Sequence, residues 1–184
     1  TPLAVGFSYP AVFVAGGLSL VIGWTLWSRE GWRGWIAWGG FTLVLLASFA
    51  ALMAVTQTAV SDASQQRMID EFWNANFPPL AKPIRLLPWL LETHASDLVA
   101  YPVGGSNYGS ILTFLCCLAA VVYLLRQKRG RMLALLLAPL GLNFVAACLQ
   151  RYPYGGHVRI ALFMGPSVCL LAGLGIAVLL DRRA

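Results

Sequence analysis

The chain has 184 residues, of which 59% are hydrophobic and only 11% are charged. Soluble domains carry about 25% charged residues, so this chain has too little charge to cover a water-facing surface. The composition excludes an ordinary soluble domain and indicates that lipid surrounds most of the chain. Because the sequence opens at Thr1 in the middle of an apolar stretch, we interpret it as a piece of a longer protein.

Five apolar segments follow one another along the chain, and none has a charged residue in its interior. Each holds ~20 residues, the length at which a helix crosses the ~30 Å hydrocarbon core of a bilayer. Segments in lipid must satisfy their backbone internally, which requires helices. We therefore predict an all-α polytopic membrane bundle, a single transmembrane domain over residues 1–184. The predicted spans are about residues 9–27, 35–56, 107–125, 132–149 and 160–180.

The last two spans contain residues that disturb an apolar helix. Pro139 is predicted to weaken the fourth helix near its centre, and Pro166 is predicted to kink the fifth. Asn143 is a polar group at membrane depth. We expect it to form an interhelical hydrogen bond, with the lining of a cavity as the alternative.

The basic residues crowd the short connections. Eight of the thirteen Lys and Arg residues lie in segments 28–34 and 126–131 and in the C-terminal tail, which together carry the whole net charge of +6. Short, Lys/Arg-rich loops stay in the cytoplasm. We therefore predict an integral protein of the bacterial inner membrane with a cytoplasmic C-terminus and the long loop facing the periplasm. The basic surplus is a topology signal, so no nucleic-acid partner is expected.

The long loop, about residues 57–106, exceeds the length of an idle connector. Residues 62–77 are predicted to form an amphipathic helix that Pro78-Pro79 ends. A second such helix is predicted over residues 83–96, with Pro88 kinking or splitting it. Both suit helices that lie in the interface plane, and either a cover for the bundle or a direct binding role would explain them.

The signatures of most soluble enzymes are absent, among them a dinucleotide fingerprint, a phosphate-binding loop and a zinc-protease motif. Neither His94 nor His157 lies in a predicted span, which argues against a haem site. The four cysteines lie in apolar segments without metal-ligand spacing, and we interpret them as packing residues. We predict no metal and no cofactor.

The polar residues of the predicted outer face concentrate in segments 92–108 and 151–159. Arginine with tyrosine and histidine neighbours at a bilayer surface suits a lipid phosphate, because its bidentate hydrogen bonds are charge-assisted. Ordinary interfacial anchoring is the alternative. The candidates for binding the lipid phosphate or donor are Arg151, Tyr152, Tyr154, His157 and Arg159. The candidates for the substrate side are His94 and Tyr101.

The same outer segments carry a resemblance to a known family. The motifs, in order, are F-P-P-L at 77–80, L-x-x-H at 91–94, A-Y-P-V-G-G at 100–105, R-Y-P-Y-G-G-x-x-R at 151–159 and L-F-M-G-P at 162–166. This order resembles the C-terminal transmembrane part of bacterial GT-C glycosyltransferases, a superfamily that includes the protein O-mannosyltransferases and aminoarabinose transferases. The similar region covers about residues 7–175.

The resemblance implies an enzyme segment that passes a sugar from a polyprenyl-phosphate carrier to a protein, lipid or glycan acceptor at the outer leaflet. Arg151, Tyr154, His157 and Arg159 match the family turn near the carrier phosphate, and His94 and Tyr101 fall on the sugar or acceptor side. The family places its catalytic Asp or Glu in an outer loop upstream of this region. The resemblance therefore implies that the catalytic base lies outside this piece, which alone would be inactive.

Two other classes remain open on the sequence. One is a non-catalytic polytopic protein, such as a transporter or an assembly subunit, for which Asn143 is the main indication. The other is an enzyme similar to the O-antigen ligases, which would be expected to carry a larger outer loop.

Overall fold

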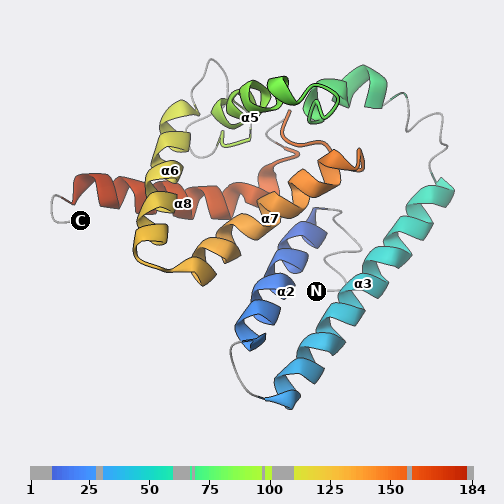
Figure 1. Cartoon of the computed structure of the whole chain (residues 1–184). Helices are drawn as coiled ribbons and strands as arrows, with labels where there is room; N and C mark the ends of the chain where they lie inside the picture. The colour runs from blue at the N-terminus through green and yellow to red at the C-terminus, as the bar shows by residue number, and fades with distance from the viewer. Residues whose placement is uncertain are drawn as a thin grey trace.

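The computed structural model describes residues 10–27, 31–59, 67, 69–96, 98–100, 110–156 and 159–181. These residues form helices and turns without a strand, which confirms the predicted all-α fold. The apolar helices of the bundle are α2 (Ala11–Trp27), α3 (Trp32–Ala59), α6 (Ile111–Arg126), α7 (Gly130–Cys148) and α8 (Gly165–Leu180) (Figure 1).

A layer of short helices lies across one end of the bundle, at the top of Figure 1. We call it the outer layer; its parts are η1 (Ile69–Trp73), η2 (Asn74–Asn76), η3 (Pro83–Arg85) and α5 (Leu86–Ala95). A further short helix, η5 (Leu162–Met164), precedes α8. Of the first predicted amphipathic helix, residues 69–76 are helical and end just before Pro78-Pro79, whereas residues 62–66 and 68 lie outside the described residues. The second predicted amphipathic helix is helical over residues 83–95.

Each of the five predicted spans overlaps one apolar helix. The segments Trp32–Val55, Gly130–Cys148 and Leu162–Leu180 are long and apolar enough to cross a bilayer. The helices α2 and α6 are equally apolar but shorter, with 17 and 16 residues. The chain therefore has the helices of a membrane bundle, and the crossing of α2 and α6 stays a prediction.

The helix α2 packs against α7 through its glycines. A Cβ atom at Gly17 would lie 3.0 Å from the nitrogen and the Cδ atom of Pro139, so the bare backbone of Gly17 accommodates the proline ring. Pro139 is buried at this contact, and α7 stays one continuous helix around it. Pro139 therefore does not break the fourth helix, because its ring packs into the gap that Gly17 leaves, and the predicted weakening stays a prediction.

The contact between α2 and α3 includes hydrogen bonds beside an apolar cluster of Ala15 and Leu45. The Ser19 and Thr42 hydroxyls lie 2.8 Å apart, and the Trp38 indole N–H donates to the Ser19 carbonyl at 2.8 Å. In lipid, such hydrogen bonds join helices that have no hydrophobic reason to associate. Asn143, in contrast, is 1% exposed, and neither atom of its amide has a partner among the described residues. The predicted interhelical hydrogen bond of Asn143 is not formed in this part of the chain.

Two other prolines take positions that the sequence did not indicate. Pro166 lies in the first turn of α8, where it begins the helix instead of kinking it. Pro88 lies in the first turn of α5, which continues unbroken to Ala95. First-turn N–H groups have no intrahelical partner, so a proline there removes no hydrogen bond.

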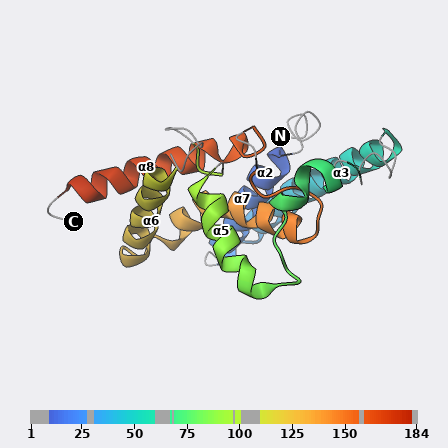
Figure 2. The same ribbon diagram turned by 90° about the horizontal axis from the view of Figure 1, so that it is seen from above.

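The helices α6 and α8 make the closest contact in the bundle, and both views show them crossing (Figures 1 and 2). A Cβ atom at Gly175 would overlap the carbonyl group of Cys116. The buried residues around this crossing are Cys116, Cys117, Ala120, Leu124, Val168, Leu171 and Ala172. Small side chains therefore set how closely the two backbones approach.

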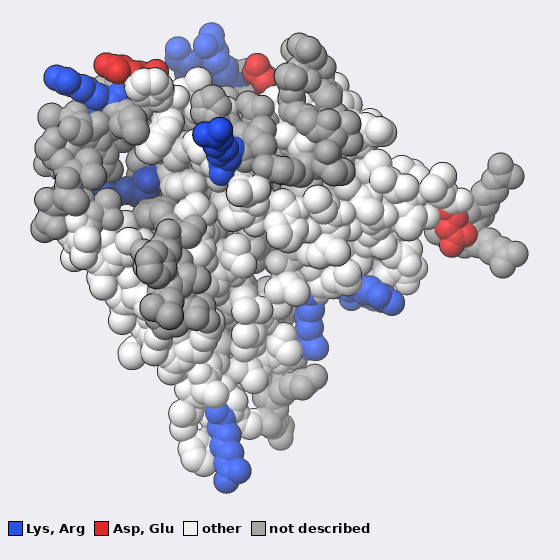
Figure 3. Space-filling view, turned by 180° about the vertical axis from the view of Figure 1, so that it is seen from behind, with Lys and Arg blue, Asp and Glu red and all other residues white. Residues whose placement is uncertain are grey.

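The two ends of the bundle differ in charge. Figure 3 shows basic and acidic side chains together over the outer layer, whereas the opposite end of the bundle shows basic ones. The basic residues of the turn between α6 and α7 are Arg126, Lys128, Arg129 and Arg131. The asymmetry expected from the sequence therefore exists in space as well as along the chain.

Because Gly175 contacts the Cys116 carbonyl, adding one methyl group at position 175 should strongly lower the stability of the fold. We expect Gly175→Ala to destabilise the fold by about 1–3 kcal/mol, because a backbone carbonyl cannot move aside as a flexible side chain can. The thermal midpoint of the purified protein in detergent measures this effect. The control is Gly173→Ala in the same helix, where a Cβ atom meets nothing within 4 Å. Equal midpoints for the two variants would contradict the proposed packing.

Candidate functional site

The turn that follows α7 begins with a Schellman motif. The N–H of Gln150 donates to the Ala147 carbonyl, and the N–H of Arg151 donates to the Ala146 carbonyl, each at 2.9 Å. Gln150 takes a left-handed conformation with φ 55°, as the motif requires. Two hydrogen bonds thus fix the backbone of Arg151 directly above the end of α7.

The first tyrosine of this turn faces α2. The Tyr152 ring lies 5.2 Å from the Phe13 ring in an edge-on arrangement, and its hydroxyl donates to the Ile160 carbonyl at 3.4 Å. Phe13 also packs against Phe163, with the ring centroids 5.4 Å apart. Tyr152 therefore closes the turn and anchors it to α2 and to the start of α8.

The second tyrosine of the turn is the centre of a buried cluster below the outer layer. Tyr154 is 3% exposed, and its ring packs against Trp89 of α5 and Phe144 of α7 at 5.8 and 5.3 Å. Its backbone N–H donates to the Asn76 carbonyl at 2.9 Å. We call Tyr154, Trp89, Phe144 and His94 the aromatic cluster.

Two glycines after Tyr154 let the turn approach the outer layer. Gly155 and Gly156 have φ values of 80° and 86°, which other residues rarely adopt. A Cβ atom at Gly155 would lie 2.8 Å from the Thr93 methyl group, and one at Gly156 would overlap the side-chain amide of Asn76. Glycine is thus required at both positions for two reasons: the backbone conformation is left-handed, and there is no space for a side chain.

A hydrogen bond joins two of the candidate residues, His94 and Tyr154. The His94 Nδ1 atom lies 2.7 Å from the Leu90 carbonyl, and its Nε2 atom lies 3.2 Å from the Tyr154 hydroxyl. A carbonyl only accepts, so Nδ1 carries a proton. In neutral His94 the Nε2 atom is then the acceptor, and Tyr154 donates to it.

Burial keeps this pair uncharged. It lowers the pKa of His94 below its ordinary value of 6.5, against a smaller opposing effect of the Leu90 hydrogen bond. Burial also raises the pKa of Tyr154. Both directions favour the neutral forms that the hydrogen-bond pattern needs.

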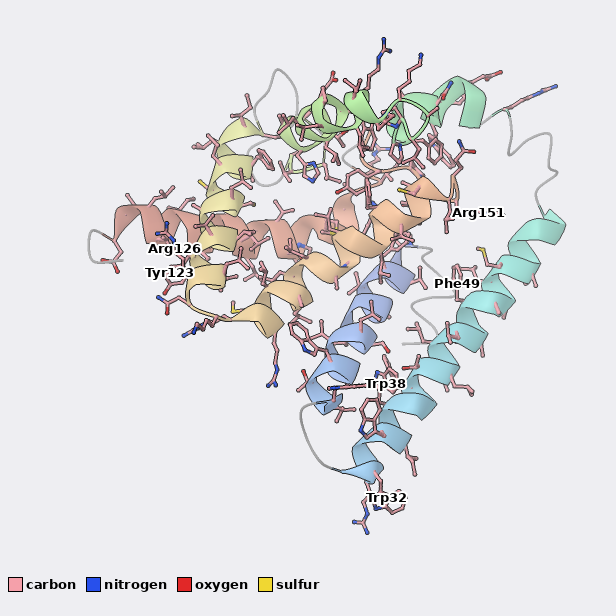
Figure 4. The ribbon with its side chains drawn as sticks, in the orientation of Figure 1. Trp32, Trp38, Phe49, Tyr123, Arg126 and Arg151 are labelled. Carbon is pink, nitrogen blue, oxygen red and sulfur yellow. The ribbon has the colours of Figure 1, made fainter. Side chains whose placement is uncertain are left out.

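Below the turn, an apolar groove opens between α2, α3 and α7. It has a volume of about 440 Å³, and its walls include Phe13 and Gly16 of α2, Phe49 of α3 and Val145 of α7. Arg151 lines the same groove at its outer end, as its place above Phe49 in Figure 4 shows. Among the residues described as lining the groove, Arg151 is the only one with a charge.

The structure divides the residues that the sequence placed at one site. Arg151 lies at the groove, Tyr152 packs beside it on Phe13, and Tyr154 meets His94 away from it. Arg159 is exposed in the turn before η5. His157 and Tyr101 lie outside the described residues.

The sequence did not indicate the residues that complete this site, namely Trp89, Phe144, Asn76 and Phe13. Trp89 and Phe144 look like ordinary apolar positions of two helices, and only the packing of α5 over α7 brings them to Tyr154. Phe13 lies at a span end, where an aromatic residue needs no special explanation.

Within the described ranges, no group of three or more His, Cys, Asp or Glu residues could hold a metal ion. The cysteines at positions 116, 117, 148 and 169 are free thiols. Cys116 and Cys117 are buried in the contact between α6 and α8, in keeping with small packing residues.

Comparison with known proteins adds no relative. No family model, no curated protein and no solved structure matches this chain. The class that the fold and the site define is thus a helical membrane protein. Its outer layer rests on an aromatic cluster above an apolar groove with an arginine at its mouth.

The buried pair of His94 and Tyr154 predicts a pH-dependent stability. Because the pKa of His94 is lower in the folded chain, the unfolded chain binds more protons, and stability falls as the pH drops below 6.5. We expect the thermal midpoint to decrease between about pH 7.5 and pH 5, and to decrease less in His94→Gln, which has no titrating ring. His157→Gln is the control for the same substitution. Identical pH profiles for the native chain and His94→Gln would refute the assignment.

Proposed function

We propose that this chain is the C-terminal membrane part of a GT-C glycosyltransferase that takes its sugar from a polyprenyl-phosphate carrier. The observation that carries the proposal is the apolar groove with Arg151 at its outer end. The resemblance of the turn at 151–159 to the family turn near the carrier phosphate supports the same assignment.

The groove has the chemistry that an isoprenoid chain and its phosphate require. Its walls are aliphatic and aromatic side chains from three helices, which suit a hydrocarbon chain that enters from the bilayer. The Arg151 guanidinium offers planar, bidentate, charge-assisted hydrogen bonds to a phosphate. We assign Arg159 as a second cation for the phosphate, and Tyr152 as the residue that holds the turn in place.

The charge distribution supports an outward-facing site. The basic turn between α6 and α7 belongs in the cytoplasm, because short Lys/Arg-rich loops are retained there. Arg151 lies at the other end of α7, so its phosphate would sit at the outer leaflet of the bacterial inner membrane, with the C-terminus in the cytoplasm. A protein, lipid or glycan acceptor would reach the sugar from the periplasm.

In this proposal the chain contributes binding and charge stabilisation. The cations offset the negative charge that develops on the departing phosphate, while a carboxylate from an upstream loop deprotonates the acceptor hydroxyl. The piece alone would bind the carrier without turning it over.

A non-catalytic polytopic protein, such as a transporter or an assembly subunit, is the second candidate. Asn143 favours it, because a buried amide without a partner in the described chain is costly and marks polar pathways in membrane proteins. Such a protein would not need the phosphate-binding arginine at the mouth of an apolar groove.

The two candidates differ in what Arg151 does. We expect Arg151→Gln to weaken the binding of polyprenyl phosphate to the purified protein by about tenfold or more, the loss of one charge-assisted hydrogen bond. Ala146→Phe, which fills the groove, should weaken it as well. Binding is measured by native mass spectrometry in nanodiscs.

Arg67→Gln is the control, because Arg67 is an exposed cation of the long loop that does not line the groove. Equal affinities of the native chain, Arg151→Gln and Ala146→Phe would refute the carrier site and leave the non-catalytic candidate. In the full-length enzyme, the same variants should lower sugar transfer from the polyprenyl-phosphate donor.

A further inference from the structure

A second cavity, separate from the groove, opens at the surface of the outer layer. It lies between η2, α5 and Gly156 of the turn after α7, and its volume is about 590 Å³. This volume falls in the ~300–1,000 Å³ range of small-molecule sites. The lining residues on which the inference rests are Asn74, Asn76, Arg85, Trp89, Glu92 and Gly156.

We infer that this cavity is a subsite for a sugar ring, formed by the Trp89 face and by the polar side chains of Asn76, Arg85 and Glu92. The inference rests on the proposed function, for which it names the place of the glycan. We call the cavity the outer pocket. Among the described residues, the outer pocket and the apolar groove share no lining residue, so each can be tested separately.

One wall of the outer pocket is a rigid aromatic ring. The Trp89 indole N–H donates to the Ala75 carbonyl at 2.9 Å, and the ring packs on Tyr154 at 5.8 Å. Because a hydrogen bond and a buried ring already restrict the indole, it loses little side-chain entropy when a ligand binds. Aromatic rings offer a flat apolar surface, which suits the C–H face of a pyranose.

The other walls carry hydrogen-bonding groups of both kinds. The amides of Asn74 and Asn76 supply donors and acceptors, Arg85 supplies donors, and Glu92 supplies acceptors. None of these side chains forms a hydrogen bond with another residue in the described part of the chain. Paired donors and acceptors that are not used within the protein match the neighbouring hydroxyls of a sugar.

The charges of the outer pocket indicate a neutral ligand. Its charged lining residues are Arg85 and Glu92, whose charges cancel. A carboxylate in the wall would repel a phosphate, whereas it accepts hydrogen bonds from a hydroxyl. The groove differs in this respect, because Arg151 is its one charged residue among those described there.

The turn after α7 holds the floor of the outer pocket in place. Tyr154 donates its backbone N–H to the Asn76 carbonyl, and the missing side chain of Gly156 leaves room for the Asn76 amide. The backbone of Asn76 is thereby placed before a ligand arrives, which lowers the entropic cost of binding.

The test measures binding of neutral methyl glycosides to the full chain in nanodiscs by saturation-transfer difference NMR. The probes are the methyl glycosides of glucose, galactose, mannose and N-acetylglucosamine. We expect at least one probe to bind, and Glu92→Gln and Arg85→Gln each to lower its affinity about tenfold, as for a lost hydrogen bond to a charged group. Gly156→Ala, which displaces the Asn76 amide, should weaken binding as well.

The controls are Glu71→Gln in η1 and Lys82→Gln just before η3, two exposed charges that do not line the outer pocket. Thermal midpoints of all variants show that each is folded. The inference is overturned if no glycoside binds, or if binding is the same in Glu92→Gln and Arg85→Gln as in the controls. Tighter binding of inorganic phosphate than of every glycoside would overturn it too.

The proposed function and the inference fail in different ways. Glu92→Gln should leave polyprenyl-phosphate binding unchanged, and Arg151→Gln should leave glycoside binding unchanged. Loss of the carrier site alone would leave a sugar-binding membrane protein, and loss of the outer pocket alone would leave a protein that binds polyprenyl phosphate.

Discussion

The architecture of the outer end depends on the burial of one side chain, Tyr154. The outer layer consists of helices of ten residues or fewer, which are too short to be stable alone in water. Tyr154 contacts three residues of the outer layer. It packs against Trp89, donates its backbone N–H to the Asn76 carbonyl and donates its hydroxyl to His94. Because Tyr154 lies in the turn that follows α7, these contacts attach the outer layer to the bundle itself.

This attachment also places the two candidate ligand regions relative to each other. Arg151 lines the groove and Gly156 lines the outer pocket, on either side of Tyr154. Five residues span at most about 18 Å of chain, so the two positions cannot be farther apart than that. The two candidate regions thus lie on the same turn, on either side of Tyr154.

The sequence predicted the helical class, the overlap of each span with a helix and the helical outer layer, because these follow from composition and apolar periodicity. It did not predict the effect of the prolines, since Pro88 and Pro166 are harmless only where a helix starts within two residues before them. Pro139 is accommodated by Gly17, a residue of another helix. Contacts of this kind depend on how the helices pack, which local sequence does not contain.

For the candidate residues too, the local sequence indicated the turn, whereas the contacts of each side chain depended on how the helices pack. The turn at 151–159 was recognised from its aromatic and basic residues, but the sequence alone could not separate Tyr152 from Tyr154. The two tyrosines are two residues apart, yet one packs on Phe13 and the other on Trp89 and Phe144. The partner that each ring finds comes from an element far away in the chain. His94 became a partner of Tyr154 for the same reason, across 60 residues.

The turns before and after α7 have similar backbone conformations and differ in their side chains. The helix α6 ends before α7 in a Schellman motif with Lys128 at φ 54°, and α7 ends in the same motif with Gln150 at φ 55°. Both turns use a residue other than glycine in the left-handed position, so their backbones carry no information about the side of the membrane. What distinguishes them is that Arg126, Lys128, Arg129 and Arg131 surround the first, while Tyr152 and Tyr154 follow the second. The backbone provides two equivalent turns; cations surround the first, and the aromatic rings that follow the second carry the outer layer.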